Sequence, residues 1–519
     1  NDTPARIDNI RFYKRALSSE EIAAINSSEG DDINALLTNI NVKGTDIPII
    51  GGQYRYIYEK GESEVTVDDI TVTTAVPSST AEITVDPGNP NLFIITVTSR
   101  KGAQLVYTLE CVNELDGAVI NFNALNRKPL FQRVAGHLYG VSEPNVPTID
   151  LLSPLKPGAV DQKPLDGLQH PSGDAFRVEA TLLESGVEHI LVNPQDMYLE
   201  WPYEQKSTMA ETLADYNARV INMLRKMQDL TGDPALSNYC FVLFNEPNGI
   251  WFSGNASNFF AAWKELYTQV KQLNPNIKVG GSAASNYSTQ WVNNFLTYCY
   301  QNNCLPEYVI WHELSGNSVQ NFRSNLAQVK PLIKQYYTDE GRDEPVIIIN
   351  EYAMFKNMGA GGSLIPWLAM FEEEGVYACL AFWGLANSLN ELAADANVPN
   401  SGWWLYKWYA DMTGERMTVS TSNTTVNELY GIGAIDEANK TVYAIFGGDD
   451  GIQTAYINGL ANTNAFNGAK SVHVKLYSTS YSGQHGEYTQ PYVEFEGNMA
   501  LRDNGSLRIS LKDCDPMDV

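Results

Sequence analysis

The sequence predicts a multidomain protein in which a central (β/α)8 TIM barrel lies between two β-sandwiches. The chain has 519 residues, which is too long for a single hydrophobic core. Its middle part alternates apolar strands with amphipathic helices, whereas both flanks alternate polar and apolar residues as strands do. The order sandwich, barrel, sandwich follows from these changes of pattern.

The N-terminal stretch IDNIRFYKRALSSEEIAAI predicts one strand followed by a short helix. Ser18 or Ser19 can cap that helix, and two glutamates lie in its first turn. The stretch resembles the closing strand and helix of concanavalin-type, laminin G-like jelly rolls. We therefore expect residues 1–30 to be the remnant of a preceding jelly-roll module or a linker. Because the chain begins without a signal peptide, we expect it to be a fragment of a longer protein.

Residues 31–115 read as strands joined by tight turns. The stretches VTVDDITVTTAV, AEITVD, NLFIITVTS and QLVYTLECV alternate with a period of two and are rich in Thr, Val and Ile. Turn sequences such as DPGNPN and RKGA separate them. This pattern predicts a small β-sandwich, and it resembles immunoglobulin-like and cadherin-like modules.

Residues 130–415 predict the barrel. Uninterrupted apolar runs are typical of parallel strands that are buried on both faces, and eight strands within about 280 residues is the size of a (β/α)8 barrel. A doubly wound open sheet is the alternative, but no Gly-rich phosphate loop follows the first strand. The eight predicted strands are 134–140, 156–162, 189–194, 239–246, 278–284, 308–313, 346–352 and 377–383.

Two segments outside the barrel predict a second sandwich. Residues 416–519 return to strands such as TVYAIFGG, SVHVKLYS and SLRISL. Residues 116–129 contain the single strand GAVINFNAL just before the barrel, which a closed barrel has no place for. We expect this strand to join the C-terminal β-sandwich.

The composition excludes several classes of function. With 61 acidic and 35 basic residues the net charge is −26, which argues against nucleic acid as a partner, because phosphate binding needs clustered Lys and Arg. No apolar stretch reaches the length of a membrane span. The His and Cys residues are dispersed without metal-ligand spacing, so we expect neither a metal nor another cofactor. Cys299 and Cys304 are close enough in the sequence to form a disulfide across a turn. The alternative is that both are free.

Two glutamates end predicted strands of the barrel. The carboxyl ends of barrel strands meet at one face, where the chemistry of such barrels takes place. Glu246 ends the fourth strand and Glu351 the seventh, each directly after an asparagine. Because these strands are three apart around a barrel, the two side chains are expected to face each other across its mouth. The other strand-end candidates are Asn193 on the third strand, His312 and Glu313 on the sixth and Trp383 on the eighth.

Facing glutamates predict glycoside hydrolysis, in which one carboxyl protonates the leaving oxygen while the other attacks the anomeric carbon. We expect the two carboxyl groups to lie about 5–5.5 Å apart, as direct attack requires. We also expect a raised pKa for Glu246 and a charged Glu351, because two acids at that distance cannot both ionise easily. The alternative is that both are exposed caps of the loops that follow their strands.

The motifs around these glutamates resemble retaining glycoside hydrolases of the large 4/7 clan, most closely family 39, with family 79 similar in architecture. The resemblance implies that Glu246, in Asn245–Glu246–Pro247, is the acid/base and that Glu351, in IIINEYAMF, is the nucleophile. It also implies that Asn245 binds the sugar 2-hydroxyl, that His312 contacts the substrate, and that Trp383 forms the floor of the subsite for the cleaved sugar. The sequence WHELSG departs from the His-X-Tyr expected of family 39.

Loops at the same face supply further candidates for substrate binding. The stretch NPQDMYLEWPYE after the third strand concentrates the aromatic and polar residues that an oligosaccharide groove needs, although Trp201 can also pack the loop down. As alternatives, Trp383 can belong to the barrel core, His312 can be a structural histidine, and Asn245 can cap the segment after it. The further candidates are Asn193, Trp201, Trp251, His170 and Tyr352.

The sequence thus predicts a secreted or cell-surface, bacterial-type retaining β-glycosidase. Its partner is a poly- or oligosaccharide substrate that it cleaves through a covalent glycosyl-enzyme intermediate. The sequence gives no indication of oligomeric state. A non-catalytic carbohydrate-binding or adhesion protein is the alternative, which the flanking modules suit but the glutamate pair does not. A barrel metallohydrolase is less favoured, because the sequence lacks the His and Asp ligands.

Overall fold

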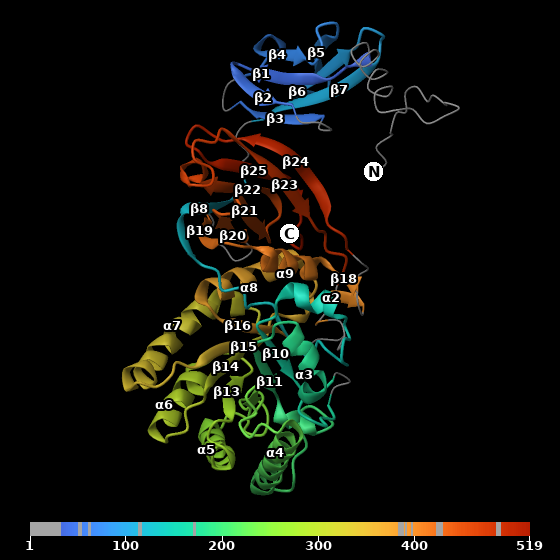
Figure 1. The fold of residues 1–519 in the computed structure, drawn as a ribbon. Helices are drawn as coiled ribbons and strands as arrows, with labels where there is room; N and C mark the ends of the chain where they lie inside the picture. The colour runs from blue at the N-terminus through green and yellow to red at the C-terminus, as the bar shows by residue number, and fades with distance from the viewer. Residues whose placement is uncertain are drawn as a thin grey trace, which may run out of the picture. The chain divides into compact units, whose positions relative to one another are not determined.

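The structure is a computed structural model that describes residues 33–49, 54–60, 64–112, 117–169, 173–381, 389, 392–395, 398–421, 429–483 and 489–519. These residues form two compact units (Figure 1). One contains the described residues up to 112 together with Ser471–Lys475 and Glu496–Ala500. The other contains the described residues within Gly117–Lys470, Leu476–Phe495 and Leu501–Val519. The predicted jelly-roll remnant lies outside the described residues and stays a prediction.

The first unit contains two small sheets that share an apolar core, in the orders β2-β1-β4 and β3-β7-β6-β5. Alternate residues of β6 carry this core, since Phe93, Ile95 and Val97 are fully buried. A sheet-rich region therefore precedes the barrel, as predicted, while its immunoglobulin-like type stays a prediction. The strands are β1 (Leu37–Val42), β2 (Thr45–Pro48), β3 (Arg55–Glu59), β4 (Ile70–Thr74), β5 (Thr80–Asp86), β6 (Asn89–Thr98) and β7 (Gln104–Val112).

In the second unit eight parallel strands close into a barrel in the order of the chain, which confirms the predicted parallel barrel. Gly136 allows the closure, because a Cβ there would lie 2.1 Å from the Ala378 carbonyl oxygen and 2.3 Å from that of Ala159. The strands are β9 (Gly136–Leu138), β10 (Ala159–Gln162), β11 (His189–Val192), β12 (Tyr239–Val242), β13 (Lys278–Ala284), β14 (Tyr308–Glu313), β15 (Val346–Tyr352) and β16 (Tyr377–Leu380).

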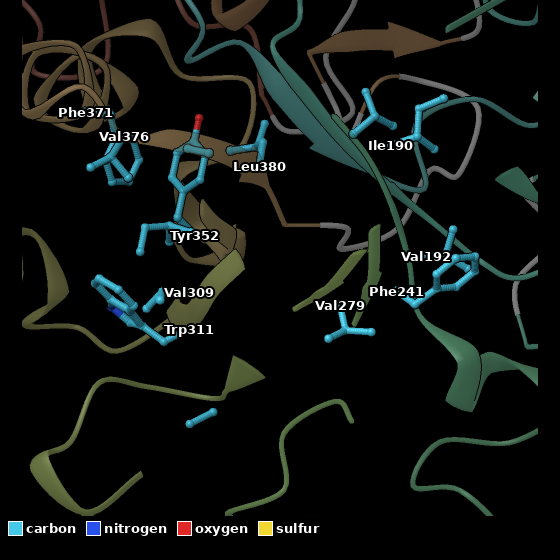
Figure 2. Packing of buried hydrophobic residues seen from close by; sticks show 14 of the residues in the cluster. Ile190, Val192, Phe241, Val279, Val309, Trp311, Tyr352, Phe371, Val376 and Leu380 are labelled. Carbon is cyan, nitrogen blue, oxygen red and sulfur yellow. The ribbon is translucent and has the colours of Figure 1, made fainter. Parts of the chain in front are cut away.

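The barrel strands bury both faces, as their uninterrupted apolar runs indicate. One apolar cluster contains Ala159, Leu191, Val242 and Ile310 inside the barrel. Residues of opposite orientation belong to a larger cluster between the strands and the helices. Figure 2 shows part of this larger cluster, with Ile190, Val192, Phe241, Val279, Val309, Trp311, Tyr352, Phe371, Val376 and Leu380 labelled.

Helices alternate with the barrel strands. In α4 the Thr208 side chain accepts from the Glu211 N–H and the Glu211 side chain accepts from the Thr208 N–H, a capping box, and Gly232 ends the helix in the left-handed conformation with φ 68°. Among the described residues no helix combines the length and apolarity that crossing a membrane requires. The helices are α2 (Ile149–Leu152), α3 (Ala175–Glu184), α4 (Met209–Thr231), α5 (Ala256–Leu273), α6 (Asn294–Gln301), α7 (Ser318–Tyr336), α8 (Gly361–Glu374) and α9 (Ser401–Asp411).

Strands from both sides of the barrel share one six-stranded sheet, in the order β21-β20-β19-β8-β22-β25. β8 (Ala118–Pro129) lies between β19, to which it is antiparallel, and β22, to which it is parallel. The barrel is therefore inserted between two neighbouring strands of this sheet. The remaining strands are β17 (Ala393–Asp395), β18 (Val398–Pro399), β19 (Glu415–Thr421), β20 (Tyr430–Asp436), β21 (Thr441–Gly447), β22 (Gly451–Asn458), β23 (Ser471–Ser478), β24 (Tyr492–Ala500) and β25 (Leu507–Cys514).

A buried carboxylate on α8 joins the two connections between barrel and sheet. Glu372 is 2% exposed and accepts from the backbone N–H groups of Phe131 and Gln132 at 2.8 Å each and from the Tyr409 hydroxyl at 2.6 Å. The Arg416 Nε lies 3.7 Å from its Oε1. Glu372 therefore holds the segment that enters the barrel, the last helix and the strand that returns to the sheet.

Replacement of this carboxylate should destabilise the second unit. Glu372→Ala leaves two N–H groups, one hydroxyl and the Arg416 charge without their partner, so the free energy of unfolding should fall by about 3–5 kcal/mol. Chemical denaturation of the two variants measures this effect. The matched control is Glu373→Ala, which removes only an exposed ion pair with Arg323 and should change stability by less than about 1 kcal/mol. Equal effects of the two substitutions would contradict the role given to Glu372.

Candidate active site

Glu246 lies just beyond the end of β12. The predicted fourth strand runs to Glu246, whereas the regular strand ends at Val242. The chain nevertheless stays against β13, because the Leu243 N–H donates to Gly280 at 3.3 Å and the Glu246 N–H donates to Ala283 at 2.9 Å. Glu246 itself has φ 46°, a left-handed conformation that costs a non-glycine residue free energy and is concentrated at functional sites. Pro247 follows directly.

A bulge in β15 places Glu351 opposite His312. Trp311 of β14 pairs with Ile349, but His312 pairs with Glu351, so Asn350 is an extra residue in β15. Bulges of this kind re-aim side chains next to active sites. Asn350 and Glu351 thereby become two successive polar residues of the site.

The two glutamates and His312 form one compact cluster. His312 Nδ1 lies 3.4 Å from Glu246 Oε1 and 3.7 Å from Glu351 Oε2, and one ligand atom from each residue lies within 4.8 Å of the other two. The histidine is fully buried, whereas the glutamate side chains are 15% and 14% exposed. The structure thus brings together Glu246, Glu351 and His312, with both carboxylates partly open to solvent.

Burial and charge raise two pKa values in this cluster. Burial by itself lowers the pKa of His312, but the carboxylates of Glu351 and Glu246 outweigh it, so the pKa lies above its ordinary value. Burial raises the pKa of Glu351 to about 7, the charge of His312 opposes that rise, and Glu246 adds to it. Glu351 therefore has a raised pKa instead of the permanent charge that the sequence predicts, because burial disfavours its charged form and the nearby Glu246 adds to this effect.

A third carboxyl group, that of Asp161, lies next to the cluster. Asp161 of β10 is fully buried and accepts from Asn350 Nδ2 at 2.8 Å. Burial raises the pKa of Asp161 well above its usual range, and the nearby charge of Glu351 adds to this effect. Asp161 was not singled out from the sequence, although an aspartate inside the apolar run GAVDQ is a signal of a buried polar site.

A hydrogen-bond network surrounds Asp196 and reaches Asn245, the residue before Glu246. Asp196, in the turn Pro194–Met197 after β11, accepts from the hydroxyl of Tyr139 and, at 3.0 Å, from that of Tyr203. The Tyr203 oxygen accepts from Asn245 Nδ2 at 3.2 Å, and the Tyr139 oxygen accepts from Asn193 Nδ2 at 3.3 Å. The sequence indicates both asparagines and the loop, but not Tyr139 or the central position of Asp196.

The other predicted binding residues are placed differently. Trp251 is 6% exposed, donates its indole N–H to the Tyr203 carbonyl at 3.1 Å and packs edge-on against Tyr198 and Tyr216. Tyr352 is fully buried with its ring against Phe371, so both aromatic rings pack in the protein interior, and their role in substrate binding stays a prediction. Trp201 is 57% exposed. His170 and Trp383 lie outside the described residues and stay predictions.

The cluster is also the one group of potential metal ligands found among the described residues. Glu246, His312 and Glu351 offer three ligand atoms, which is the number a catalytic zinc site takes from protein. The same arrangement serves acid–base chemistry without a metal, because it contains two carboxyls at different distances from one imidazole. Cys299 and Cys304 are both buried and free.

Comparisons with known proteins relate this chain to glycoside hydrolases. The model of Glycosyl hydrolases family 39 matches residues 201–347, which include Glu246 and His312. A 3-O-alpha-D-galactosyl-alpha-L-arabinofuranosidase of Bifidobacterium longum subsp. longum is 29% identical over 419 residues, which cover 69% of this chain and 36% of that protein. A 3-O-beta-L-arabinopyranosyl-alpha-L-arabinofuranosidase of Bifidobacterium pseudocatenulatum is 29% identical over 422 residues, which cover 69% of this chain and 42% of that protein. The chain therefore spans less than half the length of these relatives.

A solved structure extends the comparison to the fold. The structure of N2152 from Neocallimastix frontalis aligns with a TM-score of 0.68 and 27% identity, covering 78% of this chain and 98% of that one. Together the matches confirm the predicted resemblance to glycoside hydrolase family 39. They also support the predicted enzyme class, a glycoside hydrolase.

The raised pKa of Glu351 predicts a pH dependence of stability. Its pKa of about 7 in the folded protein exceeds the ordinary glutamate value of 4.5, so the native state binds more protons than the unfolded state between these two values. This contribution to stability is complete below about pH 4.5 and is lost as the pH rises through about 7. Glu351→Gln, which cannot ionise, should therefore be more stable than the unmodified protein at pH 8 and equally stable at pH 4.5.

Thermal unfolding of the barrel unit at both pH values measures this difference. Glu373→Gln, which replaces an exposed glutamate on the same barrel, is the matched control and should show no such change with pH. If the difference in unfolding temperature between Glu351→Gln and the unmodified protein is the same at pH 4.5 and pH 8, the raised pKa of Glu351 is contradicted.

Proposed function

We propose that this protein is a retaining glycoside hydrolase with Glu351 as nucleophile and Glu246 as acid/base. The observation that carries the proposal is the spacing of the two carboxylates, whose ligand atoms lie within 4.8 Å of each other. Retaining enzymes place the two carboxyl groups about 5–5.5 Å apart, whereas inverting enzymes need about 6.5–9.5 Å to admit a water molecule. The short separation favours direct attack on the sugar.

The proposed reaction has two displacement steps. In the first, a Glu351 oxygen bonds to the anomeric carbon while the bond to the leaving oxygen breaks, and that oxygen takes the proton of Glu246. In the second, the Glu246 carboxylate takes a proton from water, whose oxygen bonds to the anomeric carbon as the ester bond to Glu351 breaks. The configuration at the anomeric carbon is retained after two inversions.

His312 suits the redistribution of charge that this reaction needs. Its Nδ1 lies between the two carboxylates, and both carboxylates raise its pKa against the opposing effect of burial. A protonated His312 favours the charged form of Glu351, which must be a carboxylate to attack. A glycosidic oxygen beside Glu246 then provides the acceptor for the proton that remains on Glu246.

The substrate class we propose is an α-L-arabinofuranoside within a poly- or oligosaccharide. Two relatives at 29% identity carry arabinofuranosidase names, and both names specify an arabinofuranose substituted at O3. The prediction of a β-glycosidase is compatible with this class, because α-L and β-D glycosides have the same absolute configuration at the anomeric carbon. Attack from the same face therefore serves both.

The surroundings of the barrel bear on where the enzyme acts. The net charge of −26 suits a neutral polysaccharide and disfavours polyanions. We propose that the protein acts outside the cell or at its surface, with the N-terminal sheet-rich unit as an immunoglobulin-like accessory module. Extracellular action accords with a substrate too large to enter a cell.

Substitution of each glutamate should separate the two roles. Glu351→Ala should abolish turnover of aryl α-L-arabinofuranosides and of natural arabinosides alike, and added azide should restore some turnover by attacking from the vacated face. Glu246→Ala should lower kcat/KM on natural arabinosides by about 10²–10⁴-fold but should affect the first step on activated aryl glycosides much less, because a good leaving group needs no proton. Initial rates and product configuration by NMR measure both effects.

Glu313→Gln provides the control, since Glu313 is a buried glutamate on β14 that accepts from Trp311 Nε1 at 2.8 Å and from Asn325 Nδ2 at 3.1 Å. The Glu313→Gln substitution should change kcat/KM by the same factor for substrates with good and with poor leaving groups. Binding without cleavage would favour the carbohydrate-binding alternative. Loss of activity on dialysis against EDTA, restored by zinc, would instead favour a metal in the glutamate–histidine cluster.

A further inference from the structure

The network around Asp196 has a fixed direction. An ionised carboxylate only accepts hydrogen bonds, so the hydroxyls of Tyr139 and Tyr203 must both donate to it. Each phenol oxygen is then left as an acceptor. Asn193 and Asn245 occupy these acceptors with their Nδ2 groups, at 3.3 Å and 3.2 Å.

This direction determines which way the two amides face. With each Nδ2 group held by a tyrosine, the Oδ1 atoms of Asn193 and Asn245 lie on the other side of their amides. Both Oδ1 atoms are buried and have no hydrogen-bond partner in the protein. A buried amide oxygen without a partner costs free energy, which a hydroxyl of a bound ligand can recover.

The backbone ties the same turn to the residue before Glu246. Gln195 Oε1 accepts from the Asn245 N–H at 2.5 Å, so the turn that carries Asp196 holds the backbone of Asn245 directly and its side chain through Tyr203. Asp196, Gln195 and Asn193 are almost completely buried, which keeps competing water away from the network. The network therefore ends one residue from the carboxylate that we assign as acid/base.

We propose that Asp196 is a positioning residue that orients the amides of Asn193 and Asn245 so that their oxygens accept two hydroxyl groups of the sugar. This role rests on the proposed function and extends it, since it explains how one ring is held with its hydroxyls as donors. Substrates that lack such hydroxyls leave both oxygens unpaired and are discriminated against for that reason.

The charge state of Asp196 is consistent with this role. Burial raises the pKa of Asp196 to about 7, while the hydrogen bonds from Tyr139 and Tyr203 and the charge of Lys163 oppose the rise. Above that pH the carboxylate only accepts, and the direction of the network is fixed. The experiment below is therefore carried out at pH 7.5.

Asp196→Asn tests the direction of the network with little change in shape. The new amide presents an N–H donor to a tyrosine hydroxyl that also donates. The hydrogen bonds from that tyrosine to Asn193 or Asn245 therefore lose their fixed direction. We expect kcat/KM on an aryl α-L-arabinofuranoside to fall roughly 10²-fold, mostly in kcat, because contacts to the sugar hydroxyls strengthen in the transition state. The midpoint of thermal unfolding should stay the same or rise, because a buried charge is removed.

A double-mutant cycle separates positioning from a general effect. If the two residues were independent, the losses of kcat/KM in Asp196→Asn and Asn245→Ala would multiply in the double variant. We expect the kcat/KM of the double variant to be about tenfold or more above that multiplied value, since Asp196 acts partly through Asn245. Asp215→Asn is the matched control: Asp215 also accepts from a tyrosine, Tyr198 at 3.2 Å, but is 30% exposed and pairs with Arg219. Its kcat/KM should stay within about twofold of the unmodified enzyme.

Three results would overturn the inference. In the first, the losses of kcat/KM in the two single variants multiply in the double variant, which shows that the two residues act independently. In the second, Asp196→Asn keeps full activity. A fall in activity that parallels a fall in the unfolding midpoint shows a purely structural residue. If the unmodified protein cleaves no aryl glycoside at all, the proposed function fails and this inference with it, an outcome that is distinct from multiplied effects in an active enzyme.

Discussion

The site depends on holding two carboxylates around one buried imidazole. Like charges at a separation below 4.8 Å repel, and burial adds the cost of desolvation, so this arrangement needs a rigid support. The closed barrel supplies it, because its strands pack on both faces. Two local departures from regular structure, the extra residue Asn350 in β15 and the left-handed backbone at Glu246, then aim the carboxylates at His312.

The barrel was predictable because its signal is local. Each parallel strand is an uninterrupted apolar run, and the ends of those runs already place Asn193, Glu246, His312 and Glu351 at one face. The strand ends thus predict two carboxylates at that face, whereas their aim toward His312 depends on the bulge at Asn350 and the left-handed backbone at Glu246. The fourth strand shows the limit of the same reasoning, because the apolar run continues through Leu243 and Phe244 after the regular pairing of β12 has ended.

The polar network was not predictable, because it is made by residues that are distant in the sequence. Tyr139, Asp161, Asp196 and Tyr203 come from three different strands or the loops after them, and only closure of the barrel brings them together. Aromatic residues mislead for the opposite reason. Trp251 and Tyr352 lie close to Glu246 and Glu351 in the sequence, yet their rings are buried in the protein interior. The pKa of Glu351 also depends on burial that no short motif reveals.

The unpaired atoms of the site describe the ligand it suits. The Oδ1 atoms of Asn193, Asn245 and Asn350 are all buried acceptors without a partner in the protein. Acceptors near two carboxylates repel a phosphate, a sulfate or a nucleic acid, whose oxygens also accept hydrogen bonds. A neutral sugar ring presents several hydroxyl donors in fixed directions and satisfies such acceptors without adding charge. The net charge of −26 over the whole chain acts in the same sense, so the site and the surface favour the same class of ligand.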